Sequence, residues 1–157
     1  MTLVAAPPRH VVLTSWRAET LAQGSHQGTQ VVDGVLTIGA PAGTPTYEDP
    51  HAQRSVSTTY EWAAWVSPQV ETAFAATEVL PSWNAETPRD SWLLVEARTA
   101  TDEGGRRRWS PWFALARWAD SDREIHPTSV PGQGAVGARV HSVPLRLIAR
   151  LVRAVLC

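Results

Sequence analysis

The sequence contains no lysine, and its only cysteine, Cys157, is the last residue. A single cysteine excludes an internal disulfide, and it leaves no internal thiol to act as a catalytic nucleophile. Charged residues make up 18% of the chain, below the roughly 25% of typical globular domains. The formal net charge of −1 gives no general attraction to nucleic acid or to an anionic membrane, so we expect neither as a partner.

Long apolar runs are also missing. No stretch reaches the roughly 18 apolar residues that a membrane-spanning helix needs. The start, MTLVAAPPRHVVLTSW, lacks the basic residues and the apolar run of about 7–15 residues that mark a secretory signal peptide. The five histidines show neither H-x₃-H nor HExxH spacing, so we expect no zinc site and no cofactor.

What the sequence does have is tryptophan, eight in all, within short segments rich in β-branched and aromatic residues. Glycine and proline separate these segments, and helical periodicity is weak through the middle of the chain. The pattern predicts a mainly β fold, an antiparallel β-sandwich of jelly-roll type. The strongest strand segments are 29–39, 57–68, 91–99 and 109–119, the first with a hairpin at Asp33–Gly34.

We expect three parts in the chain: a flexible leader over residues 1–9, a β-sandwich domain over 10–143, and a basic amphipathic helix over 144–157. Pro7 and Pro8 oppose regular structure in the leader. The helix is predicted from the spacing of arginines, with leucine, isoleucine and valine on another side. These arginines are Arg146, Arg150 and Arg153.

Tryptophans on a sandwich face either fill the core or stack on sugar rings, and the sequence leaves both alternatives open. Core packing is the simpler explanation for most of them. Polar neighbours or strand position single out a few as candidates for ligand binding. The candidate ligand-binding residues are Trp83, Asn84, Trp112 and Trp118.

Other motifs are weaker. Asp120, Asp122 and Glu124 could contribute oxygen ligands to a loose calcium loop, although a solvated loop explains them as well and the EF-hand spacing fails. GQGAVG at 132–137 spells a dinucleotide fingerprint but lacks the strand and helix that this site requires. Three consecutive arginines, 106–108, follow Gly104–Gly105 and predict a solvated hairpin tip.

Several strings together resemble a known family: YEDPH, YEWAAWVSP, ATEVLPSWNAETPRDSW and RRWSPWFALARWADSDREIHPTSVPGQG. They are similar to the N-terminal region of actinobacterial peptidase C39 family proteins, over residues 47–140. The resemblance implies a β-rich, non-catalytic segment that precedes a papain-like cysteine peptidase domain. None of that domain's catalytic Cys, His or Asp positions has a match here, so we expect the chain alone to be inactive.

The resemblance favours an accessory domain that directs the peptidase to its substrate or to the cell wall, with a peptide or wall polymer as partner. A free-standing carbohydrate-binding module that uses exposed tryptophans is the alternative. A third possibility is an intact hydrolase whose site assembles only in space. The relatives are expected to be secreted, but the compartment of this chain stays open.

The similarity fades near Val140, where the arginine- and leucine-rich segment begins. This predicts a frameshift or a truncated gene, with a genuine terminal helix as the alternative. Translating the nucleotide sequence from codon 130 onward in all three frames distinguishes the two. Strand sequence followed by a peptidase domain in another frame would support truncation, and early stops in every frame would contradict it.

The role of Trp83 is testable by the substitution Trp83→Ala. If the side chain belongs to the core, the free energy of unfolding should fall by about 3–5 kcal/mol. If it is a ligand platform, stability should hold while binding drops. Denaturant unfolding and ligand titration of the same variant separate these two outcomes.

Overall fold

The computed structural model describes residues 10–48, 57–74, 76–120, 126–130, 132–135, 138–140 and 149–156. The leader over residues 1–9 lies outside them. The described residues are mainly β, as predicted, and contain one 3₁₀-helix, η1 (Ala18–Gln23). No helix among them is long and apolar enough to cross a membrane.

The described residues contain thirteen strands, and all of them follow η1 in the sequence. They are β1 (Ser25–Gln27), β2 (Thr29–Val32), β3 (Val35–Ile38), β4 (Thr46–Glu48), β5 (Ser57–Thr59), β6 (Ala63–Val66), β7 (Leu93–Glu103), β8 (Arg106–Trp109), β9 (Phe113–Trp118), β10 (Thr128–Ser129), β11 (Gly134–Ala135), β12 (Ala138–Arg139) and β13 (Ala149–Leu156).

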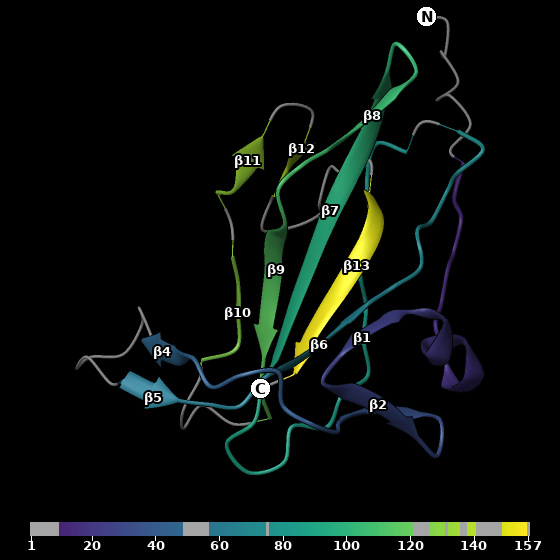
Figure 1. Cartoon of the computed structure of the whole chain (residues 1–157). Helices are drawn as coiled ribbons and strands as arrows, with labels where there is room; N and C mark the ends of the chain where they lie inside the picture. The colour runs from purple at the N-terminus through teal and green to yellow at the C-terminus, as the bar shows by residue number, and fades with distance from the viewer. Residues whose placement is uncertain are drawn as a thin grey trace, which may run out of the picture.

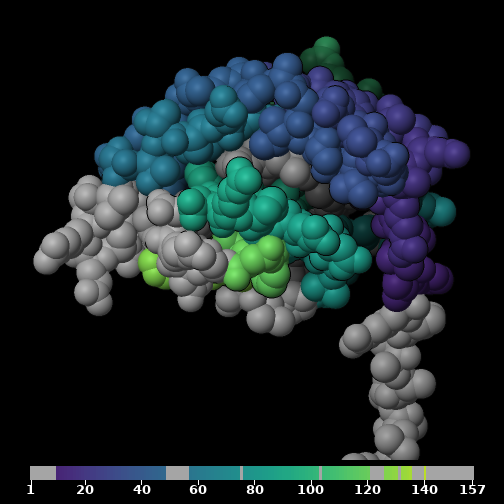
Figure 2. Space-filling model, turned by 90° about the horizontal axis from the view of Figure 1, so that it is seen from below, coloured from purple at the N-terminus to yellow at the C-terminus, as the bar shows by residue number. Residues whose placement is uncertain are grey.

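One seven-stranded sheet forms the centre of the structure (Figure 1). Its strand order is β1-β6-β13-β7-β9-β10, and β8 pairs with the outer half of β7. Three two-stranded sheets, β2–β3, β4–β5 and β11–β12, stand outside it. In Figure 2 the blue chain around β3 and β4 arches along one side of the molecule, with the teal segment near the start of β7 beneath it. The antiparallel pairing is confirmed, whereas two facing sheets of a sandwich stay a prediction.

The predicted helix over 144–157 is wrong for residues 149–156, which form strand β13 in the middle of the main sheet. Residues 144–148 and Cys157 lie outside the described part. Periodicity over so short a segment cannot separate helix from strand. The strand form pairs with two neighbours at once, β6 over four residues and β7 over seven. These ladders outweigh the helical pattern of the local sequence.

β7 is packed on both of its faces, because its successive side chains alternate between them. Leu93, Val95 and Ala97 join one apolar cluster with Phe113 and Leu115. Leu94 packs against a second cluster, which contains Ala64, Trp92 and Ala119 and is bordered by Tyr47, Tyr60 and Trp62. One face of β7 is therefore buried and the other, which carries Leu94, Glu96 and Arg98, is half-buried.

Two tight turns have the backbone conformation that their residue types favour. At Asp33–Gly34, between β2 and β3, φ is 50° and 78°. At Gly104–Gly105, between β7 and β8, φ is 58° and 78°. Positive φ at both central residues is the requirement of a type I′ hairpin, which glycine and aspartate meet at low steric cost. Both predicted hairpins are therefore present, and the three arginines lie exposed on β8.

A side-chain amide continues the sheet beside β9. The Gln133 Oε1 atom accepts a 3.0 Å hydrogen bond from the Ala114 N–H, and its Nε2 atom donates to the carbonyl oxygens of Ala114 and Val130. The residue lies inside the glycine-rich segment, where its amide pairs with the backbone as a strand would. Gln133 in the GQGAVG motif therefore has a structural role, and its position requires no bound nucleotide.

Trp92 belongs to the apolar core. Its side chain is 4% exposed, and its ring centroid lies 4.4 Å from that of Tyr60 and 5.8 Å from that of Tyr47. We therefore expect Trp92→Ala to lower the free energy of unfolding by about 3–5 kcal/mol.

Trp118 provides the matched control, since its side chain is 40% exposed at the end of β9. The substitution Trp118→Ala should lower the free energy of unfolding by about 1 kcal/mol, well below the loss at Trp92. Urea unfolding of both variants measures the difference, and equal losses would contradict the assignment of Trp92 to the core.

Candidate functional site

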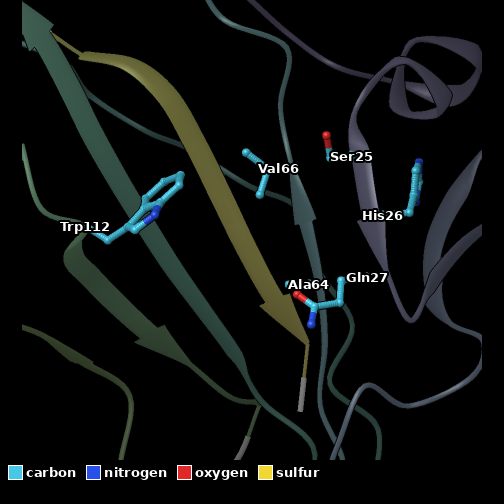
Figure 3. Close-up of a pocket in the computed structure, with 6 residues that line it drawn as sticks. All are labelled: Ser25, His26, Gln27, Ala64, Val66 and Trp112. Atoms are coloured by element: carbon cyan, nitrogen blue, oxygen red, sulfur yellow. The ribbon is translucent and has the colours of Figure 1, made fainter. Parts of the chain in front are cut away.

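A groove of about 260 Å³ opens on one face of the main sheet. Its two walls come from distant parts of the sequence (Figure 3). One wall belongs to β1 and β6, and the other is the side chain of Trp112, just before β9. The described lining residues are Ser25, His26, Gln27, Ala64, Val66 and Trp112.

The register between β1 and β6 decides which side chains face the groove. Ser25 is opposite Val66, and Gln27 is opposite Ala64. Residues directly opposite each other in an antiparallel pair share a face, so these four belong to the face of the groove. His26 is opposite Trp65 and belongs to the other face. Its ring, which lies 2.9 Å from the Thr29 hydroxyl, points away from Trp112 in Figure 3.

Trp112 is held in place by an arginine. The guanidinium carbon of Arg98, on β7, lies 4.6 Å from the ring centroid of Trp112 and 4.6 Å from that of Trp109. The cation therefore makes cation–π contacts with two indole rings. Each such contact contributes about 0.5–1 kcal/mol at exposed sites and about 2 kcal/mol when water is excluded.

The local sequence W-S-P-W explains this arrangement. Trp109 ends β8, and Trp112 precedes β9; both strands pair with β7. Ser110 connects them and bonds twice to Thr99, the residue after Arg98. Its N–H donates to the Thr99 carbonyl over 2.8 Å, and its hydroxyl accepts from the Thr99 N–H over 3.0 Å. These bonds hold the segment that carries both indoles next to Arg98.

The groove offers neutral polar groups opposite an aromatic ring. Ser25 and Gln27 are exposed and supply a hydroxyl and an amide, while Ala64, Val66 and Trp112 supply apolar surface. An aromatic face with hydroxyl and amide groups nearby suits ligands that have flat apolar patches and many neutral hydrogen-bonding groups. Sugar rings and uncharged peptide segments both meet this description.

The family model described as Peptidase C39 N-terminal domain matches residues 12–147. The chain belongs to this family. No curated protein and no solved structure matches it. The match makes the chain an accessory, non-catalytic domain of peptidase C39 family proteins. It includes every described residue of the groove and stops just before β13.

Of the four predicted ligand-binding residues in this peptidase C39 N-terminal domain, the structure places Trp112 in the groove. Trp83 is half-buried and packs against the cluster that contains Leu93 and Phe113. Asn84 and Trp118 are exposed, and neither lines the groove.

The calcium-loop candidates are only partly visible, since Asp122 and Glu124 lie outside the described residues. Asp120 is engaged in a reciprocal pair with Thr87. Its carboxylate accepts a 2.9 Å hydrogen bond from the Thr87 N–H, and its own N–H donates to the Thr87 hydroxyl over 2.7 Å. This pair ties the segment before β7 to the end of β9. Within the described ranges, no group of three or more His, Cys, Asp or Glu could hold a metal ion.

The arginine-rich hairpin tip lies apart from the groove residues in sequence and has its own partners. Arg107 forms ion pairs of 3.3 Å with Asp102 and 3.2 Å with Glu71. The hydrogen bond that the Arg107 guanidinium donates to the Asp102 carboxylate, together with the hydrogen bond and charge of Glu71, raises the pKa of Arg107 above its ordinary value. A cation already paired with two carboxylates is poorly suited to bind phosphate.

Sequence analysis missed Ser25, Gln27 and Arg98 as parts of the site. Nothing in the letters SHQ predicts a groove wall, because the pairing partner of β1 lies far along the chain. Arg98 carried a usable signal. It is a charged residue between two buried residues of β7. Two tryptophans that are three residues apart follow later in the chain, and aromatic rings of this kind are the usual partners of a half-buried arginine.

Replacing Arg98 with methionine keeps most of its length and removes its charge. We expect Arg98→Met to lower the free energy of unfolding by about 1–2 kcal/mol, because two cation–π contacts are lost. Urea unfolding measures this change. The control Arg106→Met, on the exposed strand β8, should stay within about 0.5 kcal/mol of the parent chain. Equal effects of the two substitutions would show that the stack contributes nothing specific.

Proposed function

We propose that this domain binds a neutral stretch of cell-wall polymer or peptide in the groove, and so directs a C39-type peptidase to its substrate. Support comes from the family membership together with the composition of the groove. An accessory domain needs a recognition surface rather than reactive groups, and the groove combines an indole wall with hydroxyl and amide groups on the opposite edge.

The single observation that carries the proposal is the fixed position of Trp112. A side chain that is already ordered before binding gives higher affinity, because no free energy is lost in ordering it when the ligand binds. The stack on Arg98 and the bonds between Ser110 and Thr99 provide this order before a ligand arrives. Trp118 and Asn84 are also exposed, so they are secondary candidates for a separate contact. Trp83 is a weaker one, because its ring packs on the core.

The alternative is a carbohydrate-binding module that recognises sugar alone. One observation favours it: the groove residues Ser25, Gln27 and Trp112 supply a hydroxyl, an amide and an indole ring, which are the groups that suit a sugar ring. Stacking of a sugar ring on Trp112 with hydrogen bonds to Ser25 and Gln27 would suffice. The two proposals differ in whether peptide contributes to binding.

The test is calorimetric titration with three probes: a soluble wall fragment that contains glycan and stem peptide, the glycan chain alone, and the peptide alone. Trp112→Ala should weaken binding of the fragment at least tenfold, which corresponds to about 1.4 kcal/mol. Trp118→Ala is the comparison variant, because it removes the exposed indole of a secondary candidate that lies outside the groove.

The pattern of affinities separates the outcomes. Tighter binding of the complete fragment than of glycan alone supports the substrate-directing role, and equal binding favours the carbohydrate module. Loss of binding in Trp118→Ala with normal binding in Trp112→Ala would place the ligand elsewhere and refute the groove.

A further inference from the structure

The two walls of the groove belong to two halves of the main sheet that do not pair with each other. β1 and β6 form one half, and β7, β9 and β10 form the other. Among the described strands, β13 lies between these halves and is the one that bonds to both β6 and β7. Figure 3 shows β13 passing between Trp112 and Val66.

The register shows how directly β13 connects the walls. Arg153 is opposite Val66 on β6 and Glu96 on β7. Val155 is opposite Ala64 on β6 and Leu94 on β7. The backbone of β13 therefore sets the distance between β7 and the groove residues Ala64 and Val66 on β6. Two steps of about 4.7–4.9 Å between neighbouring strands set this spacing.

Without β13, side-chain packing still links the halves near one end of the sheet. Ala64 from β6 packs in the same cluster as Trp92 and Ala119, which flank β7 and β9. Apolar contact of this kind is not directional, so it holds the halves near each other but does not fix their register. Removal of β13 would therefore leave a connected molecule whose groove walls are no longer at a set distance.

We infer that β13 is an insertable strand that assembles the groove, so that ligand binding and strand insertion stabilise each other. The inference rests on the proposed function for its ligand, and on the topology alone for the separable strand. A ligand that binds only the inserted form must oppose opening of β13 by mass action. Local opening of one strand without global unfolding is a common event in native proteins.

Hydrogen exchange of backbone amides tests this in the intact chain. With the wall fragment at 100 times its dissociation constant, the amides that bond across β6, β13 and β7 should exchange about 100-fold more slowly. Amides of the β2–β3 hairpin and of the β7–β9 ladder should keep their rates. Equal slowing of every ladder, or no slowing next to β13, would overturn the inference.

A ligand-free arm uses Ala154→Gly, which weakens β13 at a residue that is opposite both Trp65 and Val95. The substitution should speed exchange about 2–5-fold at the amides facing β13 only. Ala116→Gly, the same change on β9, should leave those amides unaffected. If Ala154→Gly speeds all ladders alike, β13 does not open separately and the inference fails. A chain that binds no wall fragment but shows the confined pattern would refute the proposed function alone.

The stronger variant Ala154→Pro removes a ladder hydrogen bond from the middle of the strand. It should bind the wall fragment more than tenfold more weakly than the parent chain. A synthetic peptide of residues 149–156, ARLVRAVL, should restore both binding and the protection of β6. Leu13→Pro, in an exposed segment without secondary structure, is the control. Unchanged binding in Ala154→Pro, or loss of every ladder without rescue by the peptide, would contradict the inference.

Discussion

The packing of β7 on both faces, one of them buried and the other half-buried, is the constraint on which the rest of this structure depends. Leu93, Val95 and Ala97 anchor one cluster, and Leu94 packs against the other. Such a strand must also pair along both edges, because unpaired backbone groups are costly to bury. β9 and β8 satisfy one edge, and β13 satisfies the other. The position of every other strand in the main sheet follows from these ladders.

The same strand gives the domain its recognition surface. On the half-buried face of β7, Arg98 follows Leu94 and Glu96, and its guanidinium lies over the indole rings of Trp109 and Trp112. One ring of this stack becomes a wall of the groove. Packing and binding therefore use the same residues, which explains how a small accessory domain can hold a ready-formed platform. Its tryptophans divide between the core, as Trp92 does, and the groove, as Trp112 does.

The sequence predicted those features that depend on neighbouring residues. The two hairpins follow from Asp33–Gly34 and Gly104–Gly105, and the family follows from continuous strings of residues. It failed where distant segments meet. β13 matched a helix by its local pattern, and only its pairing with β6 and β7 makes it a strand. Ser25 and Gln27 became groove residues through the register with β6, which no local signal predicts. Trp112 was identified as a candidate, but its stacking partner Arg98 was not.

The account makes one central claim, that the groove between β1 and Trp112 is the ligand site of this peptidase C39 N-terminal domain. Chemical-shift mapping of backbone and indole N–H groups during titration with a soluble wall fragment tests it most directly. The account predicts that the largest shifts occur at Ser25–Gln27, at Ala64 and Val66, and at the indole of Trp112. Shifts centred on Asn84 and Trp118, with none at these positions, would contradict it.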